Sequence, residues 1–150
     1  MLLTMVMMLS AGAEKPEPNA REVAEAYLGA ALAGKPSNAV KLAVEGQSPS
    51  REEGVDKLKT LLAVDKLALA KVLVTEKQSG RAFAVSEVIK VKEPGKEDQS
   101  GCLIIALNKT PDGWRVKDLD FKSEEVAKAR TKAFLDRNDD AKEIPAAKKN

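Results

Sequence analysis

The chain of 150 residues contains no histidine and only one cysteine. Without histidine, Ser-His catalysis and histidine-bound zinc are excluded, and a single cysteine cannot form an intramolecular disulfide. Cys102 is followed by Leu103, Ile104 and Ile105, so we expect a small buried apolar side chain rather than a reactive thiol. The sequence also has no nucleophile-elbow, dinucleotide-binding or phosphate-loop motif. Acid-base chemistry near neutral pH would therefore need a buried carboxylic acid or a tyrosine.

Aromatic residues and net charge are also scarce. Aromatics make up 3% of the chain, so the core must be built from leucine, valine, isoleucine and alanine. The 25 basic and 23 acidic residues are well mixed, which gives no electrostatic case for a nucleic acid or an anionic membrane as partner. Two aspartate pairs, Asp118 with Asp120 and Asp139 with Asp140, lack the spacing of a calcium loop. We expect solvated carboxylates there, and no metal or cofactor.

Residues 1–13 differ from the rest because they carry no charged side chain and include all four methionines. Residues 2–9 are typical of the apolar region of an export signal, and residues 11–13 of its small-residue cleavage site. We therefore expect a signal peptide over 1–13, a polar linker over 14–18 and a secreted or periplasmic protein. The alternative is an apolar terminus that stays attached. The run is shorter than the roughly 20 residues that span a bilayer, so we expect no membrane span.

The remaining pattern predicts one α+β domain over 19–135. Asn19, with Glu22 three residues later, forms a capping box that opens a helix ending near Gly34. Residues 136–150 have no periodicity, and we expect a mobile tail. Period and turn residues place the other elements as a short helix over 37–44, a helix opened by Ser50 and Glu53, strands over 67–76 and 81–92, a hairpin over 101–121 and a helix after Ser123. The expected fold has N-terminal helices packed on a curved four-stranded antiparallel sheet, with an added C-terminal helix.

The hairpin over 101–121 is the strongest local signal. Its turn runs from Thr110 to Gly113, and a bulged three-residue loop would pair Thr110 with Trp114. This register predicts one apolar face with Leu103, Ile105, Leu107, Leu119 and Phe121, and a second with Cys102, Ile104, Ala106, Trp114 and Val116.

The second apolar face needs a cover, because an exposed apolar patch normally marks an interaction site. Two covers are open at this point. One is a homodimer that packs sheet to sheet through Cys102, Ile104, Trp114 and Val116. The other is the last helix of the same chain, through Val126 and Phe134.

The order of the predicted elements resembles that of a known family. It consists of a long helix, NAREVAEAYLGAALAGK, the short helices after it and the closing strand GWRVKDLDF. They look like the nuclear transport factor 2-like superfamily, the cone-shaped fold shared with ketosteroid isomerase. The resemblance covers roughly 19–121 and implies an internal pocket, in which ketosteroid isomerase-like sites combine an acidic base with a tyrosine. The helix after Phe121 departs from the family pattern, and it would plug the pocket if it folded over the cone.

Two residues are candidates for a site in such a pocket. Glu87 interrupts the apolar row of Phe83, Val85, Ile89 and Val91, and Tyr27 lies on the inner side of the first helix. The predicted ligand-binding residues are Tyr27, Glu87, Phe83 and Leu107.

The predicted function is an exported, non-catalytic domain that binds a small apolar ligand or an envelope protein. One alternative is a pocket enzyme of isomerase or dehydratase type that uses Glu87 and Tyr27. If the pair is not catalytic, Glu87 lies where the strand bends out to solvent and Tyr27 is a core residue with its hydroxyl at the rim. Another alternative is a self-associating structural module.

Overall fold

The computed structural model describes residues 17–62, 67–75, 80–91 and 95–146. The expected signal peptide over 1–13 and the first part of the expected linker lie outside these ranges. The elements in chain order are α2 (Ala20–Leu32), α3 (Pro36–Val40), the short 3₁₀ helix η1 (Ser48–Ser50), α4 (Glu52–Leu62), β1 (Leu69–Val74), β2 (Arg81–Ser86), β3 (Ile89–Val91), β4 (Gln99–Thr110), β5 (Gly113–Lys122), α5 (Glu124–Arg137) and β6 (Lys142–Glu143).

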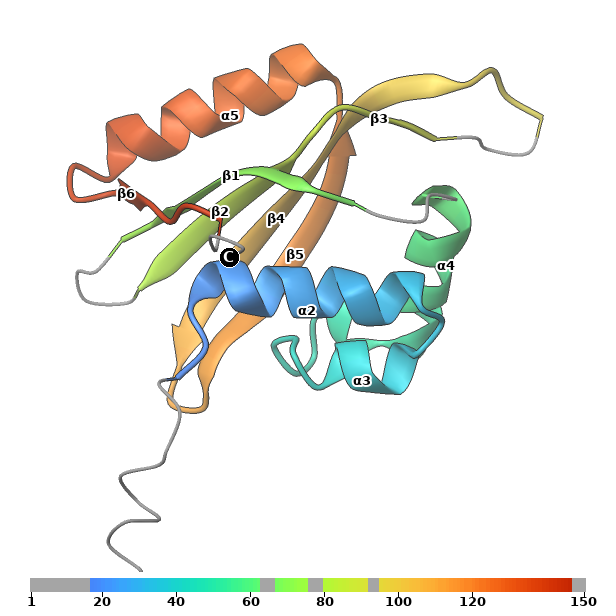
Figure 1. The fold of residues 1–150 in the computed structure, drawn as a ribbon, viewed down its shortest axis with the longest axis horizontal. Coiled ribbons are helices and arrows are strands. Elements are labelled where there is room, and N and C mark those ends of the chain that lie inside the picture. Colours follow the sequence, from blue (N-terminus) through green and yellow to red (C-terminus); the bar gives the residue numbers. More distant parts are fainter. Residues whose placement is uncertain (1–16, 63–66, 76–79, 92–94, 147–150) are drawn as a thin grey trace, which may run out of the picture.

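Helix α2 begins where the capping box predicts. The Asn19 side chain accepts a hydrogen bond from the Glu22 backbone N–H at 2.9 Å, and the Glu22 carboxylate accepts from the Asn19 N–H at 3.0 Å. Gly34, with φ of 74°, follows the helix in the left-handed region that favours glycine. Tyr27 and Leu28 are buried, and α2 lies along one face of the sheet (Figure 1).

The strands form an antiparallel sheet in which β6 pairs with β1, β1 with β2, β2 with β4 and β4 with β5. The short strand β3 pairs with the first residues of β4. The α+β class and the antiparallel sheet predicted from the sequence are confirmed. Among the described residues the sheet has six strands where four were expected, because the segment 81–92 divides into β2 and β3 and the C-terminal segment adds β6.

The β4–β5 hairpin closes with a two-residue turn rather than a three-residue one. Thr110 pairs with Gly113, whose φ is 110°, and Leu107 pairs with Val116. The extra residue lies farther along β5, where the register shifts beyond the Leu107–Val116 pair. The predicted faces of Trp114 and Val116 are therefore wrong, because both lie on the same face as Leu107. Beyond the shift the predicted pairs are confirmed, with Ile105 opposite Leu119 and Leu103 opposite Phe121.

A second irregularity interrupts the strand expected over 81–92. The buried Ser86 hydroxyl donates to the Glu87 carbonyl at 2.8 Å and accepts from the Leu103 N–H at 2.8 Å. The Ser86 hydroxyl thus replaces a backbone carbonyl as the acceptor for the Leu103 N–H, at the point where the strand bends outward. The flanking pairs are Val85 with Ile104 and Ile89 with Gly101. From Val85 to Ile89 the chain advances four residues, while the paired residues of β4, from Ile104 to Gly101, advance only three. The side chains after the break therefore point to the opposite face of the sheet.

Both faces of the sheet are covered, and we name them the inner face and the outer face. The inner face packs against α2 and α4 (Figure 1), and its buried apolar sheet residues are Leu69, Val72, Ala82, Ala84, Val91, Leu103, Ile105, Leu107, Trp114 and Val116. The outer face lies under α5, and its buried sheet residues are Leu73, Phe83, Val85, Cys102 and Ile104. The row predicted from Phe83 to Val91 is therefore wrong, since it is divided between the two faces.

The segment after 136, expected to be a mobile tail, returns to the sheet. Helix α5 continues to Arg137, and β6 pairs with the edge of β1. The Ile144 N–H donates to the Val72 carbonyl at 2.8 Å, and Nε of the buried Arg21 donates to the Ile144 carbonyl at 2.9 Å. A two-residue strand carries no readable period, which is why the sequence pattern did not predict it.

Candidate functional site

Tyr27 lies at the centre of the candidate site. Its side chain is enclosed within the inner core, and its hydroxyl donates to the Pro49 carbonyl at 2.9 Å. Burial raises the pKa of the Tyr27 hydroxyl to about 12, so the group is a neutral donor at physiological pH. The bond ties α2 to η1 and fixes one wall of a cavity.

This cavity, which we name the Tyr27 pocket, has a volume of about 310 Å³. It lies between the α2–η1–α4 layer and the β4–β5 part of the sheet. Its apolar lining comes from Tyr27, Pro49, Leu58, Leu103, Leu119 and Phe121. Its charged lining residues are Lys57, Asp118 and Asp120. The volume and the mainly apolar wall are typical of a site for a small molecule.

The α4 side of the pocket depends on a glycine. A Cβ atom on Gly54 would lie 2.9 Å from the Ser48 carbonyl oxygen, closer than real Cβ contacts allow. Glycine weakens a helix by about 1 kcal/mol relative to alanine, but here it lets α4 pack closely on η1. Sequence reasoning missed this wall and Lys57 with it. A glycine inside the predicted helix was the signal that another backbone passes close by.

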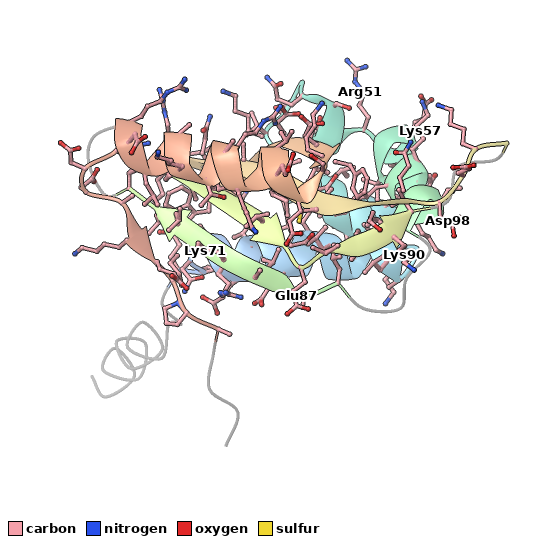
Figure 2. The ribbon with its side chains drawn as sticks, turned by 90° about the horizontal axis from the view of Figure 1, so that it is seen from above. Arg51, Lys57, Lys71, Glu87, Lys90 and Asp98 are labelled. Carbon is pink, nitrogen blue, oxygen red and sulfur yellow. The ribbon has the colours of Figure 1, made fainter. Side chains whose placement is uncertain are left out.

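Glu87 does not reach the Tyr27 pocket. It is exposed at the break between β2 and β3, and it lines a separate cavity of about 420 Å³ beneath the start of α5. We name this cavity, which is also lined by Cys102, Glu124 and Lys128, the α5 pocket. Figure 2 shows Glu87 and Lys57 at opposite sides of the view. Tyr27 and Glu87 therefore lie on different faces of the sheet and cannot act on one bound molecule.

The other two predicted ligand-binding residues also lie outside the Tyr27 pocket. Phe83 is on the outer face, where its ring stacks on Phe134 with 5.6 Å between centroids. Leu107 is 1% exposed within the inner core. Of the four predicted residues, the structure places only Tyr27 in this pocket.

The predicted dimer patch does not exist as one surface. Cys102 and Ile104 are buried on the outer face, and Trp114 and Val116 are buried on the inner face. The outer face is covered by α5 of the same chain, the second of the two predicted covers. The helix uses Ala127 and Phe134 for this contact, whereas Val126 is 38% exposed. The predicted apolar side of α5 was thus off by one position at its start.

The remaining reactive groups are held within the fold. Burial and the nearby Glu124 carboxylate raise the pKa of the Cys102 thiol. Asp118 Oδ1 accepts from the Leu119 N–H at 2.9 Å, and Asp120 Oδ2 accepts from Arg130 at 2.8 Å. In the part of the chain that the structure describes, no three histidine, cysteine or acidic side chains gather closely enough to hold a metal ion.

Comparison with known proteins identifies no relative of this chain. No protein-family model, no curated protein and no solved structure matches the chain. None of the helices within the described ranges is both long and apolar enough to cross a membrane. The proposed function is therefore drawn from the Tyr27 pocket and the α5 pocket.

Proposed function

We propose that this chain is an exported, non-catalytic domain that binds a small apolar molecule in the Tyr27 pocket. The carrying observation is the cavity of about 310 Å³ with a mainly apolar lining beside the enclosed Tyr27 side chain. Apolar walls lose contacts while they face water, and a matching ligand restores them. Export is the part of the proposal that rests on residues 1–13 alone.

The resemblance to the nuclear transport factor 2-like superfamily belongs to the same proposal. It is supported by the order of α2, α3 and α4 followed by an antiparallel sheet, and by a pocket between these helices and the sheet. No residue of α5 lines the Tyr27 pocket, so the helix that departs from the family pattern leaves it unplugged. The separation of Tyr27 from Glu87 gives no support to the alternative of an enzyme based on this pair.

The test is binding of N-phenyl-1-naphthylamine, a neutral apolar fluorophore, to the full chain. We expect a saturable rise in fluorescence with a Kd on the order of 0.1 mM, as its size allows. Leu119→Trp places a larger side chain in the pocket lining and should weaken binding at least tenfold, about 1.4 kcal/mol. Val88→Trp is the matched control, because it adds the same ring to the α5 pocket at a residue that is 49% exposed.

Ser48→Trp provides a second blocking variant at an exposed position of the lining, in case Leu119→Trp does not fold. Circular dichroism confirms the fold of each variant before titration. Absence of saturable binding to the wild-type chain contradicts the proposal. Binding that the blocking variants leave intact, or that Val88→Trp alone removes, contradicts it as well.

A further inference from the structure

The charges around the Tyr27 pocket are unevenly compensated. Its two acidic lining residues already have partners, because Asp118 accepts from the Leu119 N–H and Asp120 forms an ion pair with Arg130. Asp120 also forms a second ion pair, with 3.9 Å between its Oδ1 and Lys122 Nζ. The charge of Asp120 is therefore compensated within the fold, whereas Asp118 is an exposed carboxylate that accepts only from its neighbour's backbone.

Lys57 is the third charged residue of the lining, and it has no ion-pair or hydrogen-bond partner among the described residues. Glu53 lies four residues earlier on α4, but no ion pair joins the two side chains. Figure 2 shows Lys57 and Arg51 projecting on the same side of the molecule, and Arg51 likewise has no ion-pair partner in the part of the chain that the structure describes. Within the described ranges, the pocket lining thus presents one cation, Lys57, with which no carboxylate forms an ion pair.

The interior of the pocket offers little to a polar ligand. The Tyr27 proton is already donated to Pro49, and the surrounding wall is formed by Leu58, Leu103 and Phe121. A polar group placed there would lose its bonds to water without replacement. An apolar interior with one cation at its mouth matches a molecule with an apolar chain and an anionic head.

We propose that the Tyr27 pocket takes a small anionic amphiphile, with its chain among Leu58, Leu103 and Phe121 and its carboxylate bound by Lys57 Nζ. This inference rests on the proposed function, since it specifies the ligand class of the same pocket. It assigns to Lys57 a role in ligand selection.

The experiment compares octanoate with 1-octanol, which have equal chain length and differ in the charged head. Each is titrated against N-phenyl-1-naphthylamine bound to the full chain. Lys57→Met keeps a long apolar stem but removes the charge, and should weaken octanoate about fivefold, the value of an exposed ion pair, while 1-octanol stays unchanged. Added salt should reduce the difference between wild type and variant. Lys90→Met is the control, because Lys90 is an exposed lysine of β3 outside this lining.

The possible outcomes distinguish a failure of the anionic ligand class from a failure of the proposed apolar pocket. If the fluorophore binds but octanoate does not displace it, the anionic ligand class is wrong and an apolar pocket remains. Equal weakening of octanoate and 1-octanol by Lys57→Met shows that only the lysine stem matters, which overturns the inference. Equal weakening of octanoate by Lys90→Met reduces the effect to net charge and also overturns it. If the fluorophore itself does not bind, the proposed function fails first.

Discussion

The two faces of the sheet are covered by helices of nearly equal length but unequal burial. Helix α2, with 13 residues, has seven buried residues, and six of them belong to the core on the inner face. Helix α5, with 14 residues, buries only Ala127 and leaves Val126 and Leu135 exposed. Because the free energy from apolar burial grows with the area removed from water, the inner face should define the fold. The outer face should behave as a region covered by a helix that opens more easily.

Neighbouring isoleucines test this comparison most directly. Ile105 is 0% exposed on the inner face, and Ile104 is 4% exposed on the outer face. We expect Ile105→Ala to lower the free energy of unfolding by about 3 to 4 kcal/mol, and Ile104→Ala by about 2 kcal/mol, because α5 can shift to reduce the cavity. Denaturant unfolding followed by circular dichroism measures both. An equal or larger loss for Ile104→Ala would show that the two faces contribute alike.

The docking of α5 can be tested separately, because each face has its own chemical reporter. Trp114, the single tryptophan, is buried on the inner face, and Cys102, the single cysteine, is buried on the outer face. Phe134→Ala removes the ring that stacks on Phe83 and should cost about 1 to 2 kcal/mol. We expect the reaction of the Cys102 thiol with a disulfide reagent to accelerate about tenfold while tryptophan fluorescence stays unchanged.

Val126→Ala is the matched control for this experiment, since Val126 lies on α5 but is 38% exposed. It should leave the rate of thiol modification close to that of the wild type. A change in tryptophan fluorescence with Phe134→Ala would mean that the two faces open together. The distinction between them would then be lost.

Local sequence signals, such as helix caps, predicted the structure more accurately than the strand registers inferred from alternation. The capping box of Asn19 and Glu22 and the pairing of Leu103 with Phe121 followed from residue types and spacing, and both are present. The faces of Trp114 and Val116 did not follow, because one extra residue in β5 inverts every side chain on the turn side of it. Sequence patterns show that a hairpin forms, but the position of a bulge depends on packing.

Prediction of the candidate site failed for the same reason. Ser86 caps the Leu103 N–H and turns the chain outward, so Glu87 leaves the apolar row in which alternation placed it. An outward bend of the strand at Glu87 is the non-catalytic alternative that the sequence analysis gives for this residue. Tyr27 was predicted correctly as an inner residue, because the 3.6-residue period of a well-capped helix has no such register ambiguity. Lys57 was not found, because an exposed lysine in a helix has no pattern that marks a pocket.

The smallest expected effect concerns the buried Tyr27 hydroxyl that joins α2 to η1. Tyr27→Phe leaves the ring in place but deprives the Pro49 carbonyl of its donor, which should cost about 1 kcal/mol at neutral pH. The pKa of this hydroxyl is about 12 in the folded chain, against 10.0 for an ordinary tyrosine. Between these values the unfolded chain loses the proton and the folded chain keeps it, so wild-type stability falls as pH rises. The variant lacks this titration, so the stability advantage of the wild type over the variant should disappear between pH 10 and 12, as measured by denaturant unfolding. A constant difference across that range would show that Tyr27 is less enclosed than the inner face requires.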